Sequence, residues 1–137
     1  MQEYYAAPME GLTGWRWRQV HAALFGAADR YYTPFLSPNA NFEFQTKELQ
    51  EIAPENNQDL PVVPQILTNR AEYFIWAAKE CQSRGYGEVN LNLGCPSGTV
   101  TGKNKGAGLL RESDLLRERL DSSFDALPAM KISVKTR

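Results

Sequence analysis

Segments with the alternating pattern of β-strands and segments with helical spacing follow one another along the whole of this 137-residue chain. Five strands are predicted, at residues 4–7, 30–35, 62–67, 88–93 and 130–136. Helices with their capping residues are predicted between them, at residues 13–26, 46–52, 69–85 and 113–124. Because strands that alternate with helices build a parallel sheet, we expect an α/β fold.

The predicted helices carry apolar residues at spacings of three and four, which indicates the face that each helix turns toward the core. Thr13, Asn69 and Ser113 are the predicted N-caps, since side chains of these types satisfy free N–H groups at a helix start. The residues predicted to face the core are Trp17, Val20, Leu24, Phe74, Ala78, Cys81, Leu116, Leu120 and Phe124.

Unusual residues gather where the predicted strands end, and binding sites on parallel sheets lie at the carboxyl ends of the strands. They are Pro8, Met9, Ser37, Asn39, Gln65, Cys95 and Lys135. Five strand ends on one face are typical of a (β/α)8 barrel, also called a TIM barrel. An open doubly wound sheet is the alternative. No G-x-G-x-x-G follows the first strand, and the glycine-rich loop at 97–108 lacks the GK[ST] of a phosphate-binding loop.

The chain is short for such a barrel, which typically needs about 250 residues. We therefore expect residues 1–137 to be the N-terminal portion of a TIM-barrel catalytic domain, truncated after about five strands. A sheet with two open edges is prone to association, so we expect this segment to be poorly stable alone. A self-contained five-stranded α/β domain is the other interpretation.

Composition restricts the class of protein further. Apolar residues make up 42% of the chain and charged residues 23%, with a formal net charge of −1, which predicts a packed globular core. No apolar stretch is long enough to span a membrane, and the N-terminus lacks the pattern of a secretion signal, so a cytoplasmic protein is expected. Two cysteines and one histidine predict neither a disulfide framework nor a metal site.

Cys95 lies in a Gly-Cys-Pro corner directly after the fourth predicted strand. Gly94 permits a sharp exit and Pro96 fixes the backbone, which aims the thiol at the end of the strand. A small core residue is the alternative interpretation of a free cysteine. Asn90 and Asn92 alternate with leucines, so both face the same side of the strand, which in a barrel is the interior.

Several motifs together resemble the tRNA-dihydrouridine synthase family, in order and at matching spacing. They are Ala7-Pro8-Met9-Glu10-Gly11-Leu12-Thr13, Val63-Pro64-Gln65-Ile66, Asn90-Leu91-Asn92-Leu93-Gly94-Cys95-Pro96, Gly106-Ala107-Gly108-Leu109-Leu110 and Lys135-Thr136-Arg137. The resemblance extends from the first strand to the last residue and covers about half of a family member.

The resemblance implies an FMN-dependent barrel enzyme, with NADPH as the electron donor, that reduces the C5–C6 double bond of a uridine in tRNA. It implies that Pro8, Met9, Glu10, Gln65 and Lys135 bind the flavin, that Asn92 holds the uracil, and that Cys95 delivers a proton to C5 after hydride reaches C6. A thiol suits this role because it is mostly protonated at neutral pH. Lys135 is preferred to Lys131 because the Lys-x-Arg pattern that resembles the family falls there, whereas Lys131 lies nearer the start of the strand.

The resemblance also implies parts that this chain does not contain, namely the later barrel strands and a C-terminal helical domain that binds tRNA. We expect a monomer when the protein is complete. Lys103 and Lys105, in the glycine-rich loop, are candidate contacts for tRNA phosphates. Two alternatives stay open: another FMN barrel oxidoreductase that acts on a small pyrimidine or enone, and a truncated, non-catalytic RNA-binding module.

Overall fold

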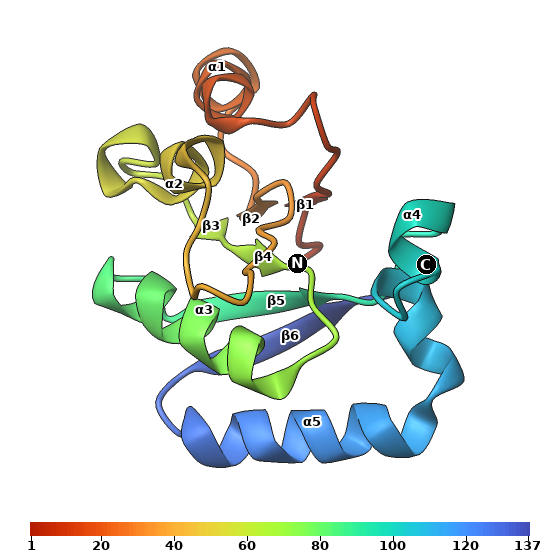
Figure 1. Ribbon diagram of the computed structural model, residues 1–137. Coiled ribbons are helices and arrows are strands. Elements are labelled where there is room, and N and C mark those ends of the chain that lie inside the picture. The colour runs from red at the N-terminus through yellow and green to blue at the C-terminus, as the bar shows by residue number, and fades with distance from the viewer.

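The computed structural model describes all residues from Met1 to Arg137 and consists of parallel strands with helices arranged around them (Figure 1). Every strand pairs in parallel with its neighbour in sequence, in the orders β1-β2-β3 and β4-β5-β6. The strands are β1 (Tyr5–Ala6), β2 (Arg30–Tyr32), β3 (Val62–Val63), β4 (Gln65–Ile66), β5 (Glu88–Asn92) and β6 (Lys131–Lys135). The predicted parallel α/β architecture is therefore confirmed.

Pro64 divides the third predicted strand into β3 and β4, because proline has no N–H to donate to a ladder. The backbone continues across the division: the Pro64 carbonyl accepts a hydrogen bond from Asn90 N at 2.8 Å, and Leu36 pairs with Ile66. The two groups of strands thus follow one another in sequence order, with β1 and β6 at the open edges. A doubly wound sheet reverses its strand order, so that alternative is wrong for this chain.

The longer helices form an arc around the strands in Figure 1. The helical segments are α1 (Trp15–Phe25), α2 (Thr46–Ile52), the 3₁₀ turn η1 (Pro54–Asn56), α3 (Ala71–Ser83), α4 (Gly98–Thr101), the 3₁₀ turn η2 (Gly106–Arg111) and α5 (Ser113–Ala126). The segment 97–108, predicted as a loop, contains α4 and the start of η2. None of the helices combines the length and apolar character needed to cross a membrane.

The main core lies between β4, β5 and β6 and the helices α3 and α5. Its fourteen buried residues include Phe74, Ala78 and Cys81, as predicted from helical spacing. Leu116 and Leu120 pack against this core, also as predicted. Phe124 was expected to do the same, but it is 52% exposed, and the inward face of α5 continues instead through the buried Ser123 and through Ala126, which packs against the core.

The inward face of α1 differs from the predicted one. Trp17, Val20 and Leu24 are 38%, 56% and 69% exposed, whereas Arg18 is the residue of this helix that is fully buried. Arg18 hydrogen-bonds to residues in and after α2, so the side of α1 that carries it must turn inward. The hydrogen bonds that the buried guanidinium needs, and not the spacing of the apolar residues, therefore decide which face of α1 turns inward.

The three predicted N-caps are wrong, since Gly14, Arg70 and Glu112 occupy those positions. Two of these side chains form other hydrogen bonds: Thr13 Oγ1 accepts from Met9 N, four residues earlier, and Asn69 Nδ2 donates to Lys103 O. The capping box of the chain lies at α2, where the Gln45 N–H donates to the Glu48 carboxylate at 2.8 Å.

Candidate active site

The seven residues to which the family resemblance assigns a role line one open hollow of about 330 Å³ at the carboxyl ends of the strands. They are Pro8, Met9, Glu10, Gln65, Asn92, Cys95 and Lys135. Pro34, Phe35, Gly94, Pro96 and Arg137 complete the lining. In Figure 1, β5 and β6 point toward the side on which α4 and the C-terminus lie. The volume falls within the range of small-molecule sites, about 300–1,000 Å³.

The Cys95 corner is held by the side chain of Asn92. Asn92 Oδ1 accepts hydrogen bonds from the backbone N–H groups of Gly94, at 3.1 Å, and Cys95, at 3.0 Å. This is the Asx-turn pattern, in which an asparagine binds backbone groups two and three residues further on. Cys95 is half-buried and so remains accessible from the hollow, unlike a core cysteine. His21 lies elsewhere, with its Nδ1 2.8 Å from Tyr31 Oη.

Glycine is required on both sides of the Cys95 corner for reasons of space. A Cβ atom on Gly94 would lie 3.0 Å from the backbone carbonyl of Thr136, so glycine lets the end of β6 approach. A Cβ atom on Gly106 would lie 2.8 Å from the carbonyl oxygen of Cys95, and Gly106 also has a φ of 55°. The sequence motif therefore reflects close packing of η2 and β6 around the thiol.

Beneath the corner, buried amide side chains form a continuous chain of hydrogen bonds. Asn92 Nδ2 donates to Gln65 Oε1 at 3.0 Å, and Gln65 Nε2 donates to Asn90 Oδ1 at 2.8 Å. Asn90 Nδ2 in turn donates to Ser133 Oγ at 2.9 Å. Gln65 keeps one amide hydrogen and one oxygen lone pair beyond these bonds, which leaves donor and acceptor capacity for a ligand.

The loop that carries Pro8, Met9 and Glu10 is fixed by Thr13. The Thr13 hydroxyl accepts a hydrogen bond from Met9 N at 2.8 Å, while Thr13 N donates to Met9 O at 3.0 Å. The Glu10 carboxylate accepts a hydrogen bond from Lys47 Nζ of α2 at 3.0 Å, and this contact raises the pKa of Lys47. The loop of residues 8–10 is thus held at the hollow by hydrogen bonds of its backbone to Thr13 and by the contact of Glu10 with Lys47.

The buried Arg18 side chain also holds this loop, through a hydrogen bond to Thr13. Its guanidinium donates to Thr13 O at 3.0 Å, to Glu51 Oε2 at 2.9 Å and to Asn57 Oδ1 at 2.8 Å. Burial lowers the pKa of Arg18, and the neighbouring Glu51 carboxylate opposes that shift. A buried charge with these partners holds α1, α2 and the loop after β1 in one arrangement.

Two lysines of β6 lie at opposite ends of the strand. Lys135 pairs with Asn92 in the register and lines the hollow, whereas Lys131 pairs with Glu88 and lies 3.2 Å from its carboxylate. Lys131 is therefore remote from the Cys95 corner.

Ser37 and Asn39 were expected at the site but do not line the hollow, because β2 ends at Tyr32 and places Pro34 and Phe35 there instead. Ser37 N donates to Glu48, and Asn39 Oδ1 accepts a hydrogen bond from Asn41 N. Sequence reasoning missed Thr13 and Phe35 as parts of this region. The close spacing of Thr13 to the Pro-Met-Glu motif was the available signal.

A basic segment lies beside the hollow, after β5. Lys103 and Lys105 form no ion pair within 4.0 Å. The pKa of Lys105 is lowered by partial burial and then by the positive charges of Lys103 and Arg70. Three cations near one another, two of them without a carboxylate partner, form a local surface that favours anions.

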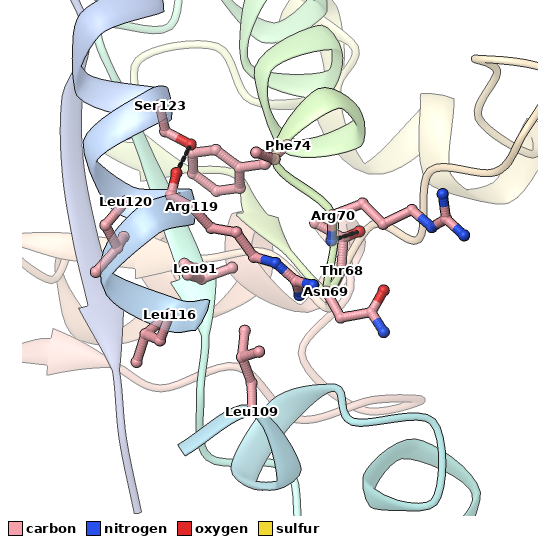
Figure 2. A pocket seen from close by; sticks show the side chains of 11 residues that line it. Thr68, Asn69, Arg70, Phe74, Leu91, Leu109, Leu116, Arg119, Leu120 and Ser123 are labelled. Atoms are coloured by element: carbon pink, nitrogen blue, oxygen red, sulfur yellow. Dashed lines mark hydrogen bonds between the residues drawn. The ribbon is translucent and has the colours of Figure 1, made fainter. Parts of the chain in front are cut away.

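A second cavity lies between α3, α5 and η2 but is far smaller (Figure 2). Its volume is about 20 Å³, enough for a water molecule but not for a cofactor. The Arg119 side chain runs toward the Thr68–Arg70 segment in Figure 2, and its Nη1 is buried without a hydrogen-bond partner. This small cavity therefore cannot hold a flavin-sized cofactor.

The fold and the site together define a parallel α/β protein with a ligand-sized hollow and an accessible thiol at the carboxyl ends of its strands. The chain belongs to the dihydrouridine synthase family, whose model, described as Dihydrouridine synthase (Dus), matches residues 5–137.

Curated relatives agree with this assignment. The chain is 33% identical over 137 residues to a tRNA-dihydrouridine(20/20a) synthase of Yersinia pestis, and 31% identical over 134 residues to one of Pasteurella multocida. A tRNA-dihydrouridine(16) synthase of Pasteurella multocida is 33% identical over 99 residues, which are 67% of this chain and 32% of that protein. The first two alignments cover 100% and 98% of this chain but only 38% and 39% of those relatives.

Proposed function

We propose that the protein to which this chain contributes reduces uridine to 5,6-dihydrouridine in tRNA. The observation that carries the proposal is the gathering, in one hollow of a chain from the dihydrouridine synthase family, of the seven residues to which the family resemblance assigns a role. The relatives named as tRNA-dihydrouridine synthases support the same reaction. Because relatives that act at different tRNA positions match this chain, the modified position is left unassigned.

We propose FMN as the cofactor, with NADPH as its reductant. The residues fit such a group: Gln65 has a free donor and a free acceptor for an amide edge, and Lys135 brings a cation to the same hollow. Pro8 and Met9 would pack along the ring, and Glu10 would contribute from the same loop. A fixed ammonium stabilises negative charge, so Lys135 would favour the reduced anionic form.

Cys95 would act as the proton donor. The hydride for C6 of the uracil would come from reduced FMN bound in the hollow. The developing negative charge at C5 and the adjacent carbonyl requires a proton, which the Cys95 thiol would give to C5, leaving a thiolate that solvent reprotonates. Asn92 fixes the backbone of Cys95 and keeps one amide hydrogen for the uracil, so it would position the donor and the substrate together.

The tRNA would approach across the segment after β5. Lys103 and Lys105 form no ion pair with a carboxylate and lie near Arg70, an arrangement suited to phosphate oxygens. Such contacts make binding depend on salt concentration, because each one displaces counterions from the nucleic acid.

The remaining part of the proposal concerns architecture. A sequential order of parallel strands is what a (β/α)8 barrel requires, and the chain covers 38% of its Yersinia pestis relative. We propose that residues 1–137 are the first part of that barrel, and that later strands and a C-terminal helical tRNA-binding domain complete a monomeric, cytoplasmic enzyme.

Disruption of the gene that encodes this chain tests the proposal. We expect dihydrouridine at one or more tRNA positions to disappear, as measured by nucleoside mass spectrometry, and to return when the wild-type gene is supplied. The Cys95→Ala variant should fail to restore it, and Cys81→Ala, which alters the buried cysteine, is the matched control. Unchanged dihydrouridine after disruption contradicts the function, and full restoration by Cys95→Ala contradicts the role of the thiol.

A further inference from the structure

The hydrogen bonds below Cys95 all run in one direction, and the backbone sets that direction. The N–H groups of Gly94 and Cys95 can only donate, so the atom of Asn92 that faces them must be its oxygen. The nitrogen of Asn92 then faces Gln65, whose oxygen must accept from it. Each amide is consequently fixed by the one before it.

The orientations of the Gln65 and Asn90 amides are fixed in the same way. With its oxygen toward Asn92, Gln65 presents its nitrogen to Asn90, which accepts through Oδ1. The nitrogen of Asn90 then needs an acceptor, and Ser133 Oγ on β6 provides it at 2.9 Å. Gln65, Asn90 and Asn92 are 1%, 2% and 8% exposed, so water cannot readily replace these partners.

We propose that Asn90 is a positioning residue which, through Gln65 and Asn92, holds the Cys95 corner and fixes the orientation of the Gln65 amide toward the hollow. Asn90 reaches the corner only through these two side chains, which join β4 and β5 below it. The effect of Asn90 on a bound ligand rests on the function proposed above. The effect of Asn90 on the Cys95 corner is independent of that function.

Loss of the Asn90 amide would leave Gln65 Nε2 without its acceptor in a buried place. The Gln65 side chain would then be held by the hydrogen bond from Asn92 Nδ2 without the one to Asn90 Oδ1, which would loosen the hold of Asn92 on the corner. An aspartic acid at position 90 keeps an oxygen for Gln65 Nε2 and accepts or donates to the Ser133 hydroxyl, according to its protonation. Asn90→Leu and Asn90→Asp are thus a pair of similar size that differ in the relevant acceptor.

Amide hydrogen exchange of the full chain, followed by NMR, measures the hold on the corner without flavin or tRNA. For Asn90→Leu we expect exchange of the Gly94 and Cys95 amides to rise about tenfold, the factor that corresponds to about 1.4 kcal/mol, roughly the net value of one hydrogen bond. Asn90→Asp should restore both rates to within about twofold of wild type. The rate of Cys95 alkylation by iodoacetamide should be changed in Asn90→Leu and close to wild type in Asn90→Asp. The buried Cys81 should not react in any of these proteins.

Ser133→Ala provides a second test if Asn90→Leu does not fold, because it removes the acceptor behind Asn90 at a half-buried position. It should raise exchange at Gly94 and Cys95 about threefold, a smaller effect because a partner is lost further from the corner. Wild-type exchange at both amides in Asn90→Leu and Ser133→Ala overturns the proposal. Equal exchange in Asn90→Leu and Asn90→Asp overturns it as well. Loss of tRNA dihydrouridine on gene disruption tests the function separately, so the two failures are distinguishable.

Discussion

Replacing Arg18 by methionine should be among the most destabilising single changes in this chain. Arg18 is fully buried, and it donates four hydrogen bonds, to Thr13 O, Glu51 Oε2, Glu51 O and Asn57 Oδ1. Methionine fills similar volume but leaves the Glu51 carboxylate buried without its cation. Removal of one partner from a buried ion pair costs about 3–5 kcal/mol.

A double replacement isolates the source of that loss. If the unpaired Glu51 carboxylate dominates, changing Glu51 to methionine in the Arg18→Met background should recover stability, because an apolar pair replaces the ion pair at little net cost. Thr13 O and Asn57 Oδ1 stay unsatisfied in the double variant, so recovery should be partial. We expect the double variant to regain about half of the roughly 3–5 kcal/mol.

Equilibrium urea unfolding, followed by tryptophan fluorescence, measures these differences in the free energy of unfolding. Lys47→Met is the matched control, since its ion pair with Glu10 lies at the surface, with the two side chains 68% and 49% exposed. That variant should keep the wild-type unfolding midpoint. A loss for Arg18→Met no greater than for Lys47→Met, or a double variant less stable than Arg18→Met, would refute the reasoning.

Three further predictions concern the thiols and the basic segment. Cys95→Ala should slow uracil reduction while leaving flavin reduction by NADPH nearly unchanged in stopped-flow assays, and equal loss of both steps would contradict its role as proton donor. Burial raises the pKa of Cys81 from 9.0 to about 12. The unfolded chain therefore loses this proton first, and stability should fall as pH rises from about 9 toward 12, less steeply in Cys81→Ala, as measured by urea midpoints. Replacing Lys103 and Lys105 by glutamate should weaken tRNA binding. It should also reduce the slope of log K against log salt concentration by about one per lysine, and an unchanged slope would exclude phosphate contacts there.

Features that depend on local chemistry could be predicted from the sequence. The α2 helix has the predicted bounds, and the Cys95 corner lies directly after a strand, because strand periodicity and a Gly-Cys-Pro turn act over a few residues. The gathering of Gln65, Asn92 and Cys95 followed from one topological rule, that parallel strands end on the same side. The order of strands then placed these residues together.

Features that depend on a distant partner could not be predicted. The inward face of α1 is chosen by Glu51, which lies 33 positions beyond Arg18 in the sequence. Asn69 has the chemistry of a helix cap, but its side chain donates instead to Lys103 O, 34 positions further along the chain. Gly94 is predicted as a turn residue, whereas its lack of a side chain accommodates the backbone of Thr136, directly after β6. In each case the residue type suits both a local and a non-local contact, and the sequence alone does not show which of the two contacts forms.

The sequential pairing of the strands has a consequence for how the chain acquires its structure. Because β2 pairs only with its sequence neighbours, and β5 likewise, each strand finds its partner one strand–helix unit away rather than across the whole chain. Pairings between neighbouring units close shorter loops than pairings between distant strands, which lowers the entropy cost of closing each loop. On the ribosome, the sheet can therefore grow strand by strand as each unit emerges.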